Sequence, residues 1–235
     1  MHRVGKKNVS YLSEDLQRRI KLIRHFQIDT IFDVGANDGG YALEVRDSGF
    51  DGKIISFEPL VDAYIDLQEI SKKDINWVVL NLALGDFDGE SEINVAGNSK
   101  SSSLLEMMEL HEVHAPSSVF IGKQPINIVR LDSLFKQYTK SISNVLLKID
   151  TQGFEKNVLI GALESLDRIM MIQIEMSIVP LYKNSFDLIE TINFLYERGF
   201  CLVSVETGFN DEVSGRTFQL DGLFVKSNLL NSNPS

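Results

Sequence analysis

Hydrophobic residues recur with two different spacings in this chain, and the two spacings alternate along it. Short segments that are apolar throughout predict buried β-strands. They lie at residues 30–35, 53–59, 75–85, 144–150 and 169–177. Between them, apolar residues recur every three or four positions, which predicts helices. These lie at residues 40–48, 61–71 and 153–166. Such alternation indicates an α/β fold with a mostly parallel central sheet and helices on both faces.

Helices are also predicted near both ends of the chain. Ser13 can cap a helix over residues 13–26, where apolar residues again recur at helical spacing. Ser185 is the predicted cap of a later helix that continues to Arg198 and ends at Gly199.

The domain organisation follows from these elements. Residues 1–28 are expected to form an N-terminal helical extension, and residues 29–228 one catalytic domain. Apolar strands at residues 200–206 and 218–227 predict an antiparallel C-terminal hairpin. Residues 229–235 should be a frayed tail.

One stretch interrupts the regular pattern. After a turn at residues 86–89, residues 91–97 read as an antiparallel partner of the strand at 75–85. Residues 97–124, named the lid segment from here on, are rich in serine and lack a long periodic run. We expect a loop with a short helix that covers a substrate.

Composition narrows the classes of partner and compartment. The formal net charge of the 235 residues is −10, and no large Lys/Arg cluster is present, so a nucleic-acid partner is not expected. The single cysteine, Cys201, cannot form an internal disulfide, which suits a reducing compartment. The start of the chain lacks a signal-peptide pattern, and no apolar run approaches the ~20 residues of a membrane span. We therefore expect a cytoplasmic protein, and the sequence leaves open whether it is a homo-oligomer.

A glycine-rich turn follows the first strand, and three ligand classes compete for it. The phosphate loop of NTPases has the spacing of Gly35 and Gly40, but requires a lysine and a hydroxyl where Tyr41 and Ala42 stand. The dinucleotide fingerprint requires a second glycine where Asn37 stands. The absence of this glycine weakens the case for a nicotinamide cofactor without excluding it.

The third class, S-adenosylmethionine, needs no phosphate cradle. It needs a tight turn and polar groups for its methionine end. Asp33, Gly35, Asn37, Asp38 and Gly39 can supply them. Glu58 ends the next strand about twenty residues later, where an acid can bind the ribose diol. The alternative is that Glu58 only caps that strand.

Several segments in this order resemble the FkbM-type family of S-adenosylmethionine-dependent methyltransferases. They read FDVGANDG, ISFEP, LNLALGD, SKSSSLL, LLKIDTQGFE and IQIEMS. The resemblance runs from about residue 29 to residue 226. It implies a Rossmann-like class I methyltransferase that O-methylates a hydroxyl of a sugar, glycoconjugate or related natural product. Gln152 replaces a glutamate that is common in the family, and this departure favours a glycan acceptor.

The resemblance also implies a set of cofactor contacts. These are Asp33, Gly35, Asn37, Gly39, Glu58, Pro59, Ala83, Leu84, Ser102 and Asp150. For Ala83 and Leu84 the alternative is core packing, and for Ser102 and its neighbours Ser101 and Ser103 it is an ordered or solvated loop.

Methyl transfer to a hydroxyl requires alignment of the acceptor and a group that takes its proton. Asp150 ends an apolar strand and is the first candidate, with helix capping as the alternative role. Glu175 ends the neighbouring strand, so the two carboxylates could share a proton or ligate Mg²⁺. Glu155, in the first turn of the next helix, is expected to be structural.

His111 and His114 have a spacing that could suit a metal. Two ligands without a partner cluster do not make a metal site, so we interpret them as exposed helix residues. We accordingly assign no metal ligand in this chain. One of the two histidines could still act as the base if the lid segment closes over the acceptor.

The sequence thus predicts an S-adenosyl-L-methionine-dependent O-methyltransferase that acts on a small-molecule or saccharide acceptor. Two rival interpretations stay open. One is an NAD-dependent oxidoreductase on a Rossmann-like fold, and the other is a non-catalytic module that binds the cofactor and a partner protein.

Overall fold

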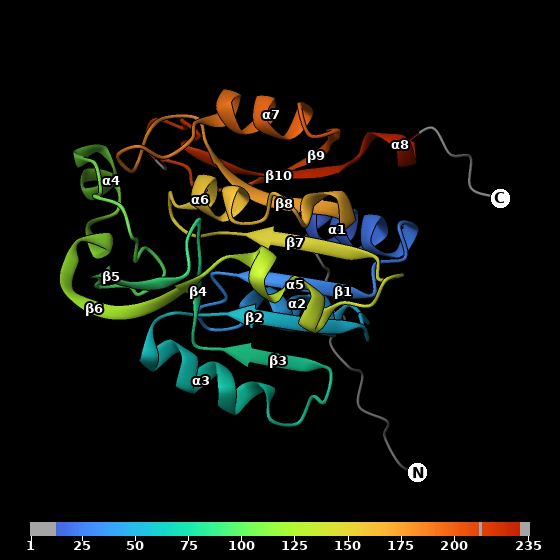
Figure 1. The fold of residues 1–235 in the computed structure, drawn as a ribbon. Coiled ribbons are helices and arrows are strands. Elements are labelled where there is room, and N and C mark those ends of the chain that lie inside the picture. The colour runs from blue at the N-terminus through green and yellow to red at the C-terminus, as the bar shows by residue number, and fades with distance from the viewer. Residues whose placement is uncertain (1–12, 212, 231–235) are drawn as a thin grey trace, which may run out of the picture.

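Strand order and direction match the predicted α/β architecture. The structure, a computed structural model of the protein, describes residues 13–211 and 213–230 (Figure 1). Its seven-stranded sheet has the order β3-β2-β1-β7-β8-β10-β9. The strands are β1 (Thr30–Val34), β2 (Lys53–Phe57), β3 (Trp77–Leu80), β7 (Val145–Ile149), β8 (Ile169–Ser177), β9 (Phe200–Thr207) and β10 (Gln219–Lys226). The pairs from β3 to β8 are parallel, whereas β10 runs antiparallel to β8 and β9, so the mostly parallel sheet and the C-terminal hairpin are confirmed.

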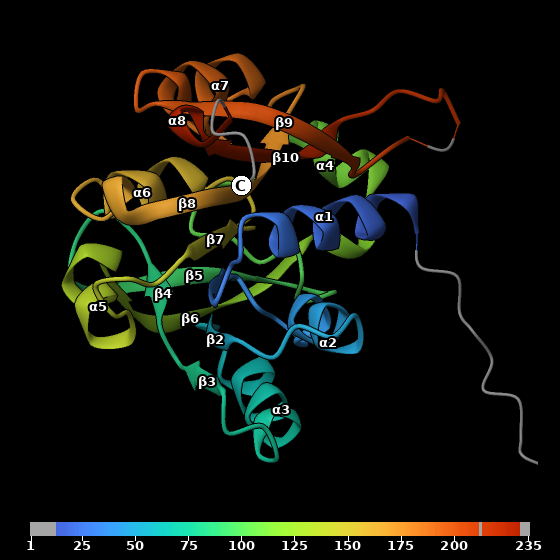
Figure 2. The ribbon, with the colours of Figure 1, turned by 90° about the vertical axis from the view of Figure 1, so that its right-hand side faces the viewer.

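Helices cover both faces of this sheet (Figure 2). They are α1 (Glu14–His25), α2 (Gly40–Asp47), α3 (Val61–Ser71), α5 (Leu131–Tyr138), α6 (Glu155–Ile160) and α7 (Leu188–Tyr196). On one face, Ile20 of α1 packs in a buried cluster with Ile31 of β1. On the other face, Phe135 of α5 and Leu159 of α6 pack in a second cluster with Phe32. Because successive strand residues point to opposite faces, each apolar strand contributes to both cores. No helix in the described part of the chain is long and apolar enough to cross a membrane.

The predicted partner of the third strand was wrong. β5 (Gly89–Ala96) pairs antiparallel with β6 (Phe120–Val129) in a separate sheet of order β4-β6-β5. The predicted strand at 75–85 divides between β3 and β4 (Ala83–Leu84), which belong to different sheets. Asn81 lies between them, and its amide donates to the carbonyls of Glu58 and Pro59 at 2.9 and 3.0 Å. These bonds hold the chain where it leaves the main sheet.

Residues 125–143 received no predicted element, yet they contain the second half of β6 and the whole of α5. Only two positions of β6, Ile126 and Ile128, are buried, and Pro125 stands beside them. A strand with a mostly exposed surface and an internal proline gives a weak hydrophobic pattern.

Helix ends test the predicted caps. Ser13 accepts a hydrogen bond from the Leu16 backbone N–H at 3.1 Å, which confirms the first cap. The second was wrong, because α7 begins after Asp187 rather than Ser185. Asp187 and Glu190 form a reciprocal capping box there. At the end of the chain, residues 227–230 form α8 (Ser227–Leu230), and residues 231–235 of the predicted frayed tail lie outside the described residues.

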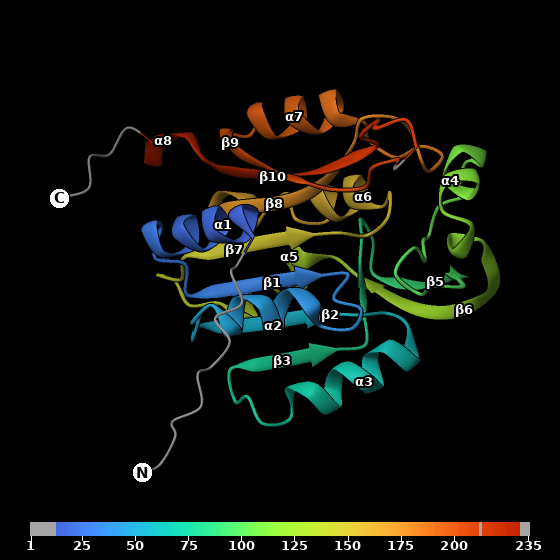
Figure 3. The same cartoon turned by 180° about the vertical axis from the view of Figure 1, so that it is seen from behind.

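The second sheet and α4 (Glu109–His114) lie beyond the carboxyl ends of the parallel strands (Figure 3). α4 is the short helix predicted within the lid segment, although residues 120–124 of that segment belong to β6. The order of the main sheet reverses between β1 and β7. Ligands of open α/β sheets bind at such a reversal, at the carboxyl ends of the strands.

Candidate active site

A cavity of about 670 Å³ lies at this reversal, lined by the ends of β1, β2 and β7. The glycine turn and the lid segment form two of its walls, and residues of β8 and β10 line the end farther along the sheet. A cavity of this size suits a ligand with the bulk of a nucleoside and an acceptor group beside it.

The glycine turn is packed directly against the end of β7. Gly35 has a φ of 75°, and a Cβ built there would lie 1.9 Å from the carbonyl oxygen of Asp150. No side chain fits at this position, so glycine allows the turn to bring Gly35, Asn37 and Asp38 to the cavity wall. Gly39 has a supporting place instead, since it precedes α2 and packs against Leu67 outside the cavity.

Glu58 connects the glycine turn to the next wall of the cavity. Its Oε2 accepts a hydrogen bond from the Asn37 backbone N–H at 2.7 Å, and its Oε1 accepts one from Leu60 at 2.8 Å. Glu58 is only 3% exposed, and burial raises the pKa of its carboxyl to about 7 although the two backbone bonds oppose the shift. Each oxygen has a second lone pair that can accept from a ligand in the cavity.

Beside Glu58 the cavity is apolar. The lining residues here are Leu60, Leu82, Ala83, Leu84, Ile93, Leu104 and Phe154, and Pro59 joins them. The structure therefore brings the predicted Pro59, Ala83 and Leu84 together around one apolar recess, next to the predicted ribose acid.

The lid segment touches both sides of the cavity. Asn37 donates to the Ser99 hydroxyl at 3.3 Å, and Lys100 forms an ion pair with Asp38 at 2.8 Å. Ser101 and Ser102 line the cavity, but the Ser102 hydroxyl already accepts a hydrogen bond from the Ala96 backbone. Ser103 is buried and donates to the Gln152 carbonyl at 2.6 Å.

Asp150 and Glu175 are brought together by one amide. The Nε2 of Gln152 donates to Asp150 Oδ1 at 2.8 Å and to Glu175 Oε2 at 3.1 Å. Tyr182 donates its hydroxyl to Gln152 Oε1 at 3.0 Å, so the nitrogen side of the amide faces the two acids. The cavity is lined by Asp150, Gln152 and Glu175, but not by Tyr182. Burial, with the nearby Asp150 carboxylate, raises the pKa of Glu175 well above its ordinary value.

Asp33 takes a supporting position rather than a place in the cavity wall. It is fully buried, its Oδ2 accepts from Ser56 at 3.1 Å, and its Oδ1 lies 3.2 Å from Lys148 Nζ. Lys148 also lies 3.7 Å from Asp150 Oδ2 and donates to the Gly35 carbonyl at 3.1 Å. Burial opposes the lysine charge, but Asp33 and Asp150 raise the pKa of Lys148 to about 12. This cation thus joins β1, the glycine turn and β7.

The interpretation of His111 as an exposed residue was wrong. It is 3% exposed, lines the cavity, and packs its ring against Tyr182 at 5.2 Å and Phe209 at 5.8 Å. Burial lowers the pKa of His111, which favours the neutral imidazole. His114 turns elsewhere and pairs with Asp211 at 3.3 Å. No group of three or more histidine, cysteine or acidic side chains in residues 13–211 and 213–230 is arranged to hold a metal ion.

Glu155 has the structural role that its position predicts. Its Oε1 accepts hydrogen bonds from the backbone N–H groups of Thr151 at 2.9 Å and Gly153 at 3.1 Å. The buried carboxylate therefore fixes the loop that carries Gln152, and it does not line the cavity.

Sequence reasoning missed several residues that line the cavity. They are Arg19, Tyr41, Lys148, Gln173, Gln219 and Asp221. A signal was present for three of them, because Lys148, Gln173 and Asp221 are polar residues with apolar neighbours inside predicted strands. A polar residue inside such a strand must find a partner or a ligand.

Comparison with known families settles the class of this protein. The family described as "Methyltransferase FkbM domain" matches residues 33–202, well over half of the chain. The chain belongs to the FkbM methyltransferase family. The name of the family describes methyltransferases, and S-adenosylmethionine is the cofactor that methyltransferases of this fold generally use. No curated protein matches the sequence significantly.

One solved structure of an FkbM methyltransferase shares the fold of this chain. A methyltransferase FkbM from Methylobacillus flagellatus KT aligns with a TM-score of 0.52 and 13% identity, over 83% of this FkbM chain and 43% of the other. This chain thus spans less than half the length of that protein. An rRNA methylase from Streptococcus thermophilus aligns with a TM-score of 0.49 and 11% identity, over 92% of this chain and 99% of the other. At these identities the likeness to the first structure concerns the fold alone.

Proposed function

We propose that this protein is an S-adenosyl-L-methionine-dependent O-methyltransferase whose acceptor is a hydroxyl of a sugar, glycoconjugate or related natural product. The position of Glu58 carries the assignment of the donor. Its carboxyl is held by two backbone N–H groups between the glycine turn and the apolar recess, and both of its oxygens can still accept hydrogen bonds.

The residues around Glu58 fit the donor's parts. A buried acid with two free lone pairs suits the vicinal hydroxyls of ribose. The adjacent recess, with Ala83 and Leu84 in its wall, suits an adenine ring. On the other side, the backbone of Gly35 and the side chain of Asn37 supply polar groups for the methionine end.

The acids on the other side of Gly35 support the transfer step. When bound, S-adenosyl-L-methionine supplies a methyl group whose C–S bond breaks as the acceptor oxygen forms a C–O bond, leaving S-adenosyl-L-homocysteine. Asp150, whose side chain is 41% exposed at the cavity, would accept the proton of the acceptor hydroxyl. Gln152 holds this carboxylate beside Glu175 and keeps both in place.

The rival oxidoreductase has less support. Asn37 occupies the position of the second glycine of the dinucleotide fingerprint, and its side chain reaches Ser99 of the lid segment. Calorimetric titration distinguishes the two. The proposal expects S-adenosyl-L-homocysteine to bind and NAD to give no heat, whereas the reverse would favour the oxidoreductase.

Catalysis is distinguished from a non-catalytic role by Asp150→Ala. The variant should still bind S-adenosyl-L-homocysteine but should lose transfer of labelled methyl groups into fractionated host glycans. Mass spectrometry of the labelled product would locate the methylated oxygen. Transfer at the wild-type rate would remove Asp150 from the mechanism.

A further inference from the structure

The cavity continues past Asp150 into a second, polar recess. Gln173 and Glu175 of β8 line it, together with Asp221 of β10. Asp221 lies opposite Glu175 in the antiparallel pair, so the two side chains share a face of the sheet. Gln173 precedes Glu175 by two residues and lies on that same face. Arg19 of α1 and Tyr41 of α2 complete the walls.

Both cations in this recess already have carboxylate partners. Arg19 is 8% exposed, and its Nε lies 3.0 Å from Glu206 Oε1 while its Nη1 lies 3.1 Å from Glu44 Oε2. Lys148 pairs with the fully buried Asp33 at 3.2 Å. Lys148 also lies 3.7 Å from Asp150 Oδ2, so its charge is shared between two acids, and neither cation forms an ion pair with Glu175 or Asp221.

Two acids in the recess consequently lack a cation of their own. Glu175 accepts from the neutral amides of Gln152 and Gln219, at 3.1 and 2.8 Å, and forms no ion pair with the described residues. Asp221 accepts no side-chain hydrogen bond and forms no ion pair within the described part of the chain. A carboxylate that is removed from bulk water without a paired cation is unfavourable, so the carboxyl either takes up a proton or binds a ligand that carries positive charge.

Independent of these acids, the recess contains unused hydrogen-bond acceptors. Gln173 is only 3% exposed. Its Nε2 donates to Glu206 at 3.4 Å, but its Oε1 has no hydrogen-bond partner. The hydroxyl of Tyr41 is likewise buried without a partner. Buried polar atoms of this kind are few in native proteins, and a ligand is one explanation for them.

We propose that this polar recess binds an ammonium group of the methyl acceptor, so that the substrate is an amino sugar or another amino alcohol. An ammonium group donates three hydrogen bonds and accepts none. It therefore matches the free Gln173 oxygen and the Asp221 carboxylate, and its charge favours the ionised form of Asp221 over the protonated form. A protonated amine has no lone pair, so the methyl group goes to a neighbouring hydroxyl. The inference rests on the proposed O-methyltransferase function.

Paired probes test this directly in protein saturated with S-adenosyl-L-homocysteine. D-glucosamine is compared with D-glucose, and D-galactosamine with D-galactose, with D-glucuronate as the anionic probe. Binding is measured by ligand-observed NMR at pH 7. We expect the amine of at least one pair to bind about tenfold more tightly than its neutral counterpart, and glucuronate not to bind.

Variants assign the preference to the recess. Asp221→Asn should reduce the amine preference to less than about threefold. Asp167→Asn is the matched control, because Asp167 is 96% exposed and precedes β8 at the opposite end of the strand. Retained binding of S-adenosyl-L-homocysteine shows that each variant is folded.

The outcomes separate the two proposals. If S-adenosyl-L-homocysteine does not bind the wild type, the donor assignment fails. If it binds and no pair shows an amine preference, including the case in which no sugar binds, the ammonium inference is overturned. A preference that Asp221→Asn leaves unchanged also overturns it.

Discussion

The amide nitrogen of Gln152 lies 2.8 Å from Asp150 Oδ1 and is oriented by the Tyr182 hydroxyl on the other side of the same amide. A second bond from this nitrogen, to Glu175 at 3.1 Å, makes one neutral side chain the link between two acids. The common family residue, glutamate, has no N–H to donate. Glutamine at this position therefore changes how the acids are held.

Replacing Gln152 with Glu should impair methyl transfer. The substitution removes both donated bonds and places a third carboxyl beside Asp150 and Glu175. Like charges raise the pKa of a carboxyl, so the pH at which transfer reaches half its maximum should rise by about 1. At pH values below this midpoint, transfer should fall about tenfold, measured with the labelled donor and the glycan fraction that the wild type modifies.

Gln137→Glu provides the matched control for that measurement. Gln137 is exposed on α5, and it also contacts a tyrosine hydroxyl, that of Tyr138 at 3.2 Å. Its replacement should leave the pH profile unchanged. If Gln152→Glu also left the pH profile of the wild type unchanged, the amide link would have no part in transfer.

Gly35→Ala should be far more damaging than Gly215→Ala. Both glycines have a positive φ, 75° and 72°, so each alanine variant should lose about 1–2 kcal/mol from backbone strain. Only at Gly35 would the new Cβ also meet a backbone atom, whereas nothing lies within 4 Å of it at Gly215. Urea unfolding should show a further loss of more than about 2 kcal/mol for Gly35→Ala, or no folded protein. Equal losses would contradict the close packing of the turn on β7.

Lys148→Met should destabilise the protein through Asp33. The aspartate is fully buried and would lose its cation, which typically costs about 3–5 kcal/mol of unfolding free energy. Adding Asp33→Asn should recover part of this loss, because the uncompensated charge is then removed. Lys72→Met, at an exposed lysine, is the control. A loss below about 1 kcal/mol in Lys148→Met would mean that the buried pair contributes little.

Stability of the ligand-free protein should fall as the pH rises from about 4 to 7. Burial, and then Asp150, raise the pKa of Asp221 to about 7, whereas an unfolded aspartate titrates near ~3.9. In that window the folded state holds a proton that the unfolded state has released, so the unfolding free energy decreases with pH. Asp221→Asn should flatten the decrease in urea titrations, and Asp167→Asn should not. An identical slope in wild type and Asp221→Asn would contradict the assigned burial.

The sequence was most informative where one physical requirement acts alone. Strands buried on both faces must be apolar throughout, which identified β1, β2, β7 and β8 and hence the parallel sheet. A turn that packs on another backbone must use glycine, which located Gly35. The position of Glu58 followed from its place at the end of β2.

The sequence was less informative where contacts depend on distant segments. The burial of His111 depends on Phe209, almost a hundred residues away, and on Tyr182 between them. β5 pairs with β6 rather than with β3, which is nearer in the sequence, and no local pattern encodes that pairing. The polar recess is assembled from α1, α2, β8 and β10, so only the folded chain brings its residues together.

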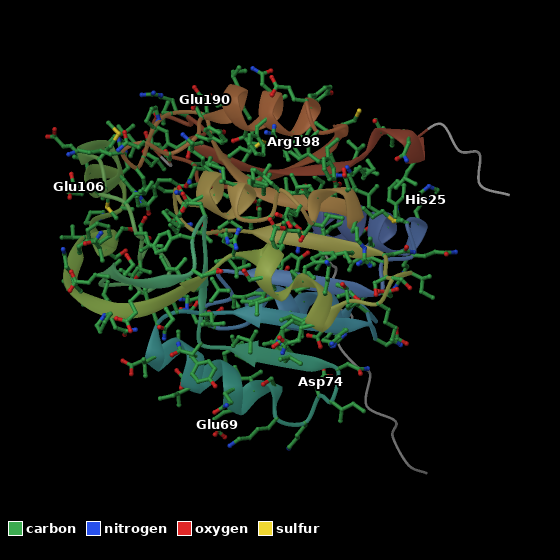
Figure 4. All side chains as sticks on the ribbon, viewed as in Figure 1. His25, Glu69, Asp74, Glu106, Glu190 and Arg198 are labelled. Atoms are coloured by element: carbon green, nitrogen blue, oxygen red, sulfur yellow. The ribbon has the colours of Figure 1, made fainter. Side chains whose placement is uncertain are left out.

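Calorimetric titration of S-adenosyl-L-homocysteine into the wild type and Glu58→Gln tests the donor site most directly. Glutamine cannot accept hydrogen bonds on both of its head-group atoms, so affinity should fall about tenfold to a hundredfold, which corresponds to about 1.4–2.8 kcal/mol. Glu69→Gln, on the exposed side of α3 (Figure 4), should bind like the wild type. Absence of binding to the wild type, or equal affinity in all three proteins, would contradict the assignment of this cavity to an adenosyl methyl donor.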